Sequence, residues 1–168
     1  MINTREDDEF SHLVIAAPSV DISNIDTSKV TVNDNVEFYK QHVVSSCNNI
    51  FAIAQTALTN YPNLNNVVIM QHAPRYDRAD VDPTGLKPEL AKFANTMFSQ
   101  MLHSSPWREK ITIGEHSLEC SDDLFEKMFV NGQSGWYDGI HIHNRQGRNF
   151  YTKSLLNIFK HCLPIGCP

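Results

Sequence analysis

The residues best suited to chemistry are Asp138 and His141, which lie three positions apart in the last third of the chain. A histidine at such a site takes a proton from a serine hydroxyl, and a nearby carboxylate holds the imidazole in the tautomer that this transfer needs. The pattern therefore predicts the acid–base pair of a serine hydrolase, with His141 as the general base and Asp138 as the residue that orients it. No matching serine motif is evident upstream, so the question of catalysis depends on the nucleophile.

A second histidine, His143, follows His141 by two positions, and the His-x-His pattern beside Asp138 also resembles a set of metal ligands. A closed zinc site needs a third or fourth ligand at fixed geometry, and His116 is the plausible recruit. Because the pattern is short and common by chance, we predict neither a metal nor a cofactor. His143 is instead predicted to contact a bound ligand.

Four further residues are candidates for the same site: Ser19, Asp21, Arg75 and Trp136. Ser19 would replace a missing nucleophile if it came within hydrogen-bond reach of His141. Arg75 belongs to a charged, aromatic loop that either contacts a ligand or is simply solvated, and the second reading is the commoner one for such loops. Trp136 either walls a pocket or packs in the core.

Strands and helices alternate along the chain. Short apolar runs predict strands at residues 13–17, 66–71 and 111–113, and apolar spacing of three and four predicts helices at residues 36–59, 87–103, 122–129 and 145–161. The polar segment 19–33 is typical of a loop. The first long helix is expected to bury one face, formed by Phe38, Val43, Cys47, Ile50, Phe51, Ala54 and Leu58.

This alternation predicts an α/β fold, with a parallel sheet covered by helices on both faces. Functional groups in such sheets gather in the loops beyond the carboxyl ends of the strands. We therefore expect the loops at residues 18–24, 72–77, 115–120 and 136–143 to converge on one edge of the sheet.

The block from Asp138 to His141, with Gly147 opening the last helix, resembles the closing block of the SGNH hydrolases, the GDSL-like esterase and lipase family. Residues 13–21 are similar to the family's strand and loop with its second glycine and its asparagine, and residues 66–75 to the strand that follows its first long helix. The resemblance implies a three-layer α/β/α domain with a parallel sheet in flavodoxin-like order, reduced here to three or four strands.

The chain departs from this family at its nucleophile. The family's Gly-Asp-Ser block is missing, and Pro18 and Val20 stand where the family has the glycine and the asparagine that bind the oxyanion. Proline has no N–H and valine has no side-chain amide, and losing one oxyanion donor costs about 10²–10³ in rate. We therefore expect a non-catalytic domain that binds a ligand or a protein. The alternative is a serine ester hydrolase of esterase or acetylesterase type, whose serine lies in an upstream segment.

The missing family strand would lie beside the strand at residues 13–17, so its absence leaves that sheet edge bare. Bare edges are usually paired or covered. We expect a homo-oligomer or a partner chain at this edge, or an upstream segment that completes the sheet, and a weaker third hypothesis is a pure assembly module. A small ester or acyl compound is the ligand that the resemblance implies.

The bulk composition fits one soluble globular domain spanning residues 1–168. Apolar residues make up 41% and charged residues 20%, and the net charge of −5 disfavours nucleic acid as a partner. No apolar run is long enough to span a bilayer, and the acidic amino terminus does not resemble a secretory signal, so we expect no membrane partner and a cytoplasmic location.

The cysteines form no CxxC pair. Cys47 is expected to be a small buried thiol, and Cys162 and Cys167 to be reduced.

Overall fold

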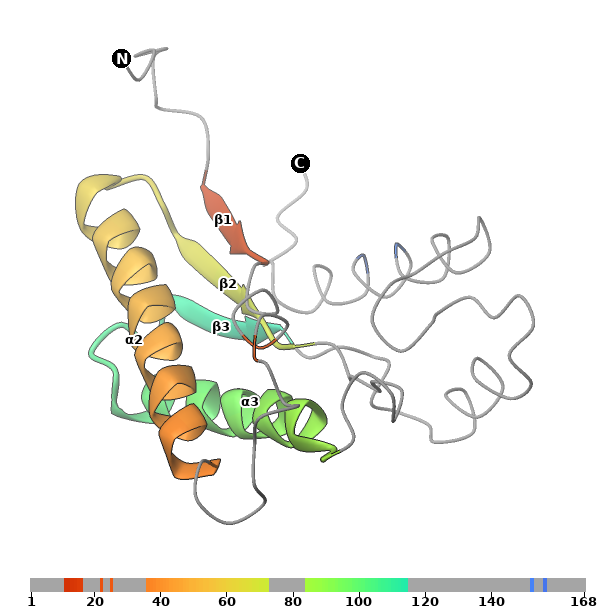
Figure 1. Cartoon of the computed structure of the whole chain (residues 1–168). Coiled ribbons are helices and arrows are strands. Elements are labelled where there is room, and N and C mark those ends of the chain that lie inside the picture. The colour runs from red at the N-terminus through yellow and green to blue at the C-terminus, as the bar shows by residue number, and fades with distance from the viewer. Residues whose placement is uncertain are drawn as a thin grey trace, which may run out of the picture.

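The fold is a small α/β arrangement of three strands and two helices, seen in a computed structural model that describes residues 11–16, 22, 25, 36–72, 84–114, 152 and 156 (Figure 1). Its elements are β1 (His12–Ile15), α2 (Val36–Asn60), β2 (Asn66–Met70), α3 (Leu86–Ser104) and β3 (Ile111–Gly114). The predicted strands and the two long helices are thus confirmed to within a few residues at their ends. The predicted short helix at residues 122–129 lies outside the described residues.

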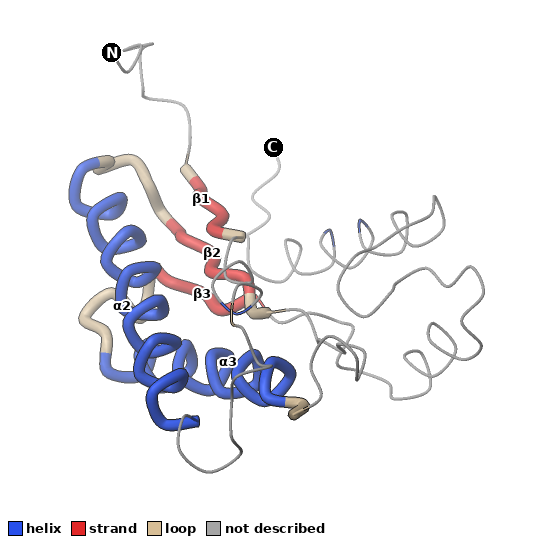
Figure 2. The backbone as a smooth tube through the Cα atoms, in the orientation of Figure 1, coloured by secondary structure: helices blue, strands red, loops and turns tan. Residues whose placement is uncertain are grey.

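The three strands form a parallel sheet in the order β1-β2-β3, as Figure 2 shows in red. Ile15 pairs with Ile69, and Met70 pairs with Gly114, so the carboxyl ends of the three strands are level. A level end places the residues after each strand along one edge. The prediction of a parallel α/β sheet is therefore confirmed for the described part of the chain.

Both long helices pack against each other and against the same face of the sheet. Val67, Ile69 and Ile111 form the sheet side of this core, together with side chains of α2 and α3. Val68 and Met70 alternate to the opposite face, and they too are buried, with 0% and 2% of their surface exposed. Both faces of β2 are therefore shielded from water, as expected for a central strand of a parallel sheet.

The buried stripe of α2 leaves out the first residue that the sequence indicated. It consists of Val43, Cys47, Phe51, Ala54 and Leu58. The prediction that Phe38 joins this stripe is wrong, because 54% of its surface is exposed. A step of four back from Val43 reaches Tyr39, and that ring packs against the core in its place. Phe38 instead meets the His42 ring edge-on, with 4.5 Å between centroids.

The predicted loop at residues 19–33 is wrong at Ile22, which is helical and only 2% exposed, as part of the core. Ile25 of the same segment also packs against the core, so the polar composition of the segment concealed its apolar contacts. In the predicted final helix, Thr152 and Leu156 are helical, and its other residues lie outside the described part. Neither of the long helices that the structure describes is apolar enough to cross a bilayer.

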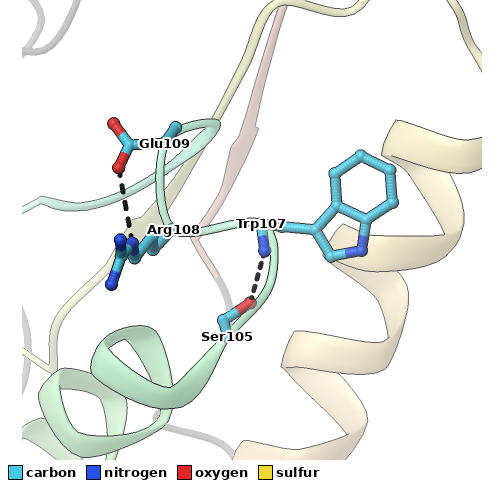
Figure 3. Close-up of polar contacts among 4 residues, drawn as sticks. All are labelled: Ser105, Trp107, Arg108 and Glu109. Carbon is cyan, nitrogen blue, oxygen red and sulfur yellow. Dashed lines mark hydrogen bonds and ion pairs between the residues drawn. The ribbon is translucent and has the colours of Figure 1, made fainter.

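A tight turn links α3 to β3 (Figure 3). The hydroxyl of Ser105 accepts a hydrogen bond from the backbone N–H of Trp107 at 3.1 Å, and the carbonyl of Trp107 accepts one from the N–H of Lys110 at 2.8 Å. The Trp107 side chain packs against the core and lies on the opposite side of the turn from Arg108 and Glu109. The turn thus places an apolar ring inward and an ion pair outward.

Candidate functional site

The carboxyl edge of the sheet is the candidate site, because ligands of open parallel α/β sheets bind beyond the carboxyl ends of the strands. Ala16 follows β1, Gln71 and His72 follow β2, and β3 ends at Gly114. The N–H of Gln71 donates to the carbonyl of Gly114 at 3.0 Å, so the ladder runs one residue past β2. Gln71 and His72 therefore lie at the middle of this edge.

His72 is held in place by Asn95 of α3. The side-chain oxygen of Asn95 accepts a hydrogen bond from the backbone N–H of His72 at 2.7 Å, and its nitrogen donates to the carbonyl of His72 at 3.1 Å. The His72 ring stacks on Phe98, with centroids 6.2 Å apart and planes inclined by 13°. Only 5% of His72 is exposed, so the chain leaves β2 along a fixed path.

Gln71 is a buried polar side chain at this edge. It is 8% exposed, and its Oε1 atom is buried and accepts no hydrogen bond from the described residues. A buried acceptor without a donor costs about 1–3 kcal/mol. The described residues therefore supply no donor for this atom.

A cavity lies behind His72, lined by Val43, Cys47, Ala94 and Phe98 among others, and its volume is about 10 Å³. That space is at the lower limit for a single water molecule, so it does not hold a ligand. Burial raises the pKa of the Cys47 thiol to about 11. The thiol is therefore protonated at neutral pH and unsuited to act as a nucleophile. The prediction that Cys47 is a buried structural thiol is confirmed.

A second polar group lies at the amino ends of the strands, on the edge opposite the candidate site. Asn66 donates to the Thr112 hydroxyl at 3.0 Å, and the Ser11 hydroxyl lies 2.7 Å from Nδ1 of His12. Nε2 of His12 and Oδ1 of Asn66 are buried without partners among the described residues. Because ligands of parallel sheets bind at the carboxyl ends, we treat this group as structural.

The site residues predicted from the sequence all lie outside the described residues. They are Asp138 and His141 as acid and base, and Ser19, Asp21, Arg75, Trp136 and His143 as binding residues. Their placement relative to Gln71 and His72 therefore stays a prediction. Among the described residues, no group of three or more His, Cys, Asp or Glu side chains is positioned to hold a metal ion.

Sequence reasoning identified the loop after β2 but missed Gln71 and Asn95. A signal for Gln71 is present, since a polar residue directly continues the fully apolar run Val67–Met70. Asn95 carries a weaker one: it is a polar residue beside Ala94 on the buried face of α3.

Comparison of the chain with known protein families, curated proteins and solved structures gives no significant match. The class that the described residues define is an α/β protein with a three-stranded parallel sheet, one face of which carries two helices.

Proposed function

We propose that this chain is an SGNH-hydrolase-like domain that binds a small ligand at the carboxyl edge of its sheet without using serine chemistry. The proposal extends the three described strands to the family's three-layer α/β/α arrangement. Contiguous parallel strands in the order β1-β2-β3, joined through α2 and α3, support that extension.

The observation that supports the binding function is the buried Oε1 atom of Gln71, in the middle of the edge, which accepts no hydrogen bond from the residues that the structure describes. Beside it, Asn95 fixes the backbone of His72, so the edge is pre-organised. A rigid edge with one unsatisfied acceptor favours a ligand that carries a hydrogen-bond donor. An ester without a hydroxyl or amide group would leave Gln71 unsatisfied, so an acyl ligand should also carry a hydroxyl.

Monobutyrin, the glycerol ester of butanoic acid, is a suitable probe because it joins an acyl group to free hydroxyls. Ethyl butanoate is its matched control, since it has the same acyl group and no donor. In an NMR titration of the isotope-labelled chain, monobutyrin should shift the amide signals of Ala16, His72 and Gly114. Signals of His12 and Asn66, at the amino ends, should stay in place.

The variant Gln71→Met keeps the length of the side chain and removes the acceptor. It should weaken monobutyrin binding by about ten-fold and leave the weaker binding of ethyl butanoate unchanged. If monobutyrin shifts no signal at the carboxyl edge, or binds wild type and Gln71→Met equally, the proposed function is wrong.

The alternative proposal is a serine ester hydrolase, and it is supported by the spacing of Asp138 and His141 in the sequence. Its test is hydrolysis of 4-nitrophenyl acetate, whose good leaving group demands little of an oxyanion site. A rate that is lost in both His141→Ala and Ser19→Ala, and retained in a Ser11→Ala control, would favour catalysis. Equal background rates in all four proteins would exclude it for this chain.

A further inference from the structure

A groove of about 540 Å³ is lined by α3, by β3 and by the turn between them. Ser99, Leu102 and His103 of α3 form one wall, and the strand residues Ile111 to Ile113 form the floor. Arg108 and Glu109 line it at the amino end of the strand, where Figure 3 shows them on the outer side of the turn. The groove therefore combines an apolar floor with a charged rim.

The floor of this groove includes the edge of β3 that no other described strand pairs with. The carbonyls of Lys110 and Gly114 accept hydrogen bonds from β2, so the even-numbered residues of β3 turn their backbone groups toward β2. The odd-numbered residues turn theirs outward. The N–H of Ile111 is used locally, since it donates to the carbonyl of Trp107 at 3.0 Å. No described residue bonds to the outward N–H and C=O of Ile113, which an added strand would satisfy.

The charged rim indicates the sign of the charge that a partner should carry. The Nε atom of Arg108 lies 3.4 Å from Oε1 of Glu109, and both side chains are largely exposed, at 63% and 87%. An exposed ion pair of this kind is weak, so Glu109 is easily displaced. No described residue other than Glu109 pairs with the Arg108 guanidinium, and a guanidinium binds a carboxylate with two parallel hydrogen bonds.

We infer that this groove binds an extended peptide of a partner protein, which adds to β3 as a further strand and places a carboxylate on Arg108. The free backbone groups of Ile113 would set the register, and alternate apolar side chains of the peptide would cover Leu102 and Ile113. A second copy of this chain is a poorer occupant. β3 has four residues, and pairing two such strands would bury far less than the ~1,200 Å² typical of a stable interface.

The test is selection of peptides from a random nonapeptide display library on the whole chain, followed by affinity measurements with the selected peptide made synthetically. We expect alternating apolar residues and at least one Asp or Glu. Arg108→Gln should weaken binding about ten-fold, and Glu109→Gln should strengthen it by a factor of about two to five, because Arg108 is then free. Lys40→Gln on α2 changes the net charge as Arg108→Gln does, and it should bind like the wild type. N-methylation of the peptide amide that faces Ile113 should abolish binding.

Three results would overturn the inference. The first is a selection that enriches no sequence over a display without the protein. In the second, the selected peptide binds Arg108→Gln and wild type equally, or tolerates N-methylation at every position. The third is that decanoate displaces the peptide and binds with the same dependence on Arg108, which would make the groove a site for small amphiphilic acids. Because these readouts do not involve Gln71, they are independent of the monobutyrin experiment.

Discussion

Asn95 pairs with His72 as one strand pairs with another: its side-chain amide both accepts from the N–H of His72, at 2.7 Å, and donates to the carbonyl, at 3.1 Å. The pair ties α3 to the residue that follows the central strand. It therefore supplies the hydrogen bonds that the backbone loses when β2 ends. The backbone needs them, because His72 is buried and only 5% exposed.

Replacing Asn95 with alanine should destabilise the fold by about 2–4 kcal/mol, because two buried backbone groups of His72 lose their partners. Urea unfolding measures the change, and hydrogen exchange of the His72 amide should accelerate in the variant. Gln100→Ala, at an exposed position of the same helix, is the control and should change stability by less than about 0.5 kcal/mol. An Asn95→Ala protein as stable as this control would show that the pair contributes nothing.

Two phenylalanines that look equivalent in the sequence should behave very differently. Phe98 is 0% exposed and contacts both Phe51 and His72, so Phe98→Ala should cost about 3–5 kcal/mol. Phe38 is 54% exposed, and Phe38→Ala should cost less than about 1 kcal/mol. Thermal or urea unfolding of the two variants measures the contrast. Similar losses in both variants would contradict the observed boundary of the α2 stripe.

The contrast between these residues also shows how far sequence patterns reach. The period of three and four located α2 and α3, because burial of one helix face requires that spacing over many residues. Short apolar runs located the strands for a different reason, since strands of a parallel sheet are covered on both faces, as the buried residues Val67–Met70 of β2 show. The pattern does not fix which residue begins the buried stripe, since Phe38 and Tyr39 are both aromatic and only packing against the core decides between them.

The candidate site was harder to predict for a different physical reason. Asn95 and His72 are 23 positions apart in the sequence, and their pairing depends on how α3 docks on the sheet. Gln71 becomes a candidate site residue only once its burial is known and its Oε1 atom is seen to have no partner among the described residues. The rule for parallel strands therefore pointed to the carboxyl edge of the sheet as the candidate site, but sequence patterns could not identify Gln71 and Asn95 as its buried polar side chains.

Cys47 should make stability depend on alkaline pH. Burial raises its pKa from 9.0 to about 11, so between these values the unfolded chain has lost the thiol proton and the folded chain has kept it. The folded state then binds more protons, and stability falls as the pH rises through this window, by roughly 2–3 kcal/mol in all. The loss should vanish in Cys47→Ala. Stability should be measured by urea unfolding across this pH range. The other cysteines are first replaced (Cys120→Ser, Cys162→Ser, Cys167→Ser), so that Cys47 is the only thiol that titrates.

In that background the Cys47 thiol should react with Ellman's reagent only on unfolding, since it is 1% exposed and protonated at neutral pH. Rapid labelling of the folded protein, or a stability that does not change across the alkaline window, would contradict the assignment of a buried, neutral thiol.

Gln71 should show opposite effects on stability and on binding. Gln71→Met removes a buried acceptor that has no described partner and keeps the volume of the side chain, so the ligand-free variant should be more stable than the wild type by about 1 kcal/mol.

Gln71→Glu has the same shape but places a carboxylate in the same buried position, and it should be destabilised by several kcal/mol at neutral pH. Burial raises the pKa of such a carboxyl group, so stability should return as the pH falls and the group becomes neutral. Urea unfolding of the three proteins at neutral and acidic pH measures both effects. A Gln71→Met variant that is less stable than the wild type would mean that Oε1 already has a partner inside the protein. The amide would then have a structural role and would not be available to bind a ligand.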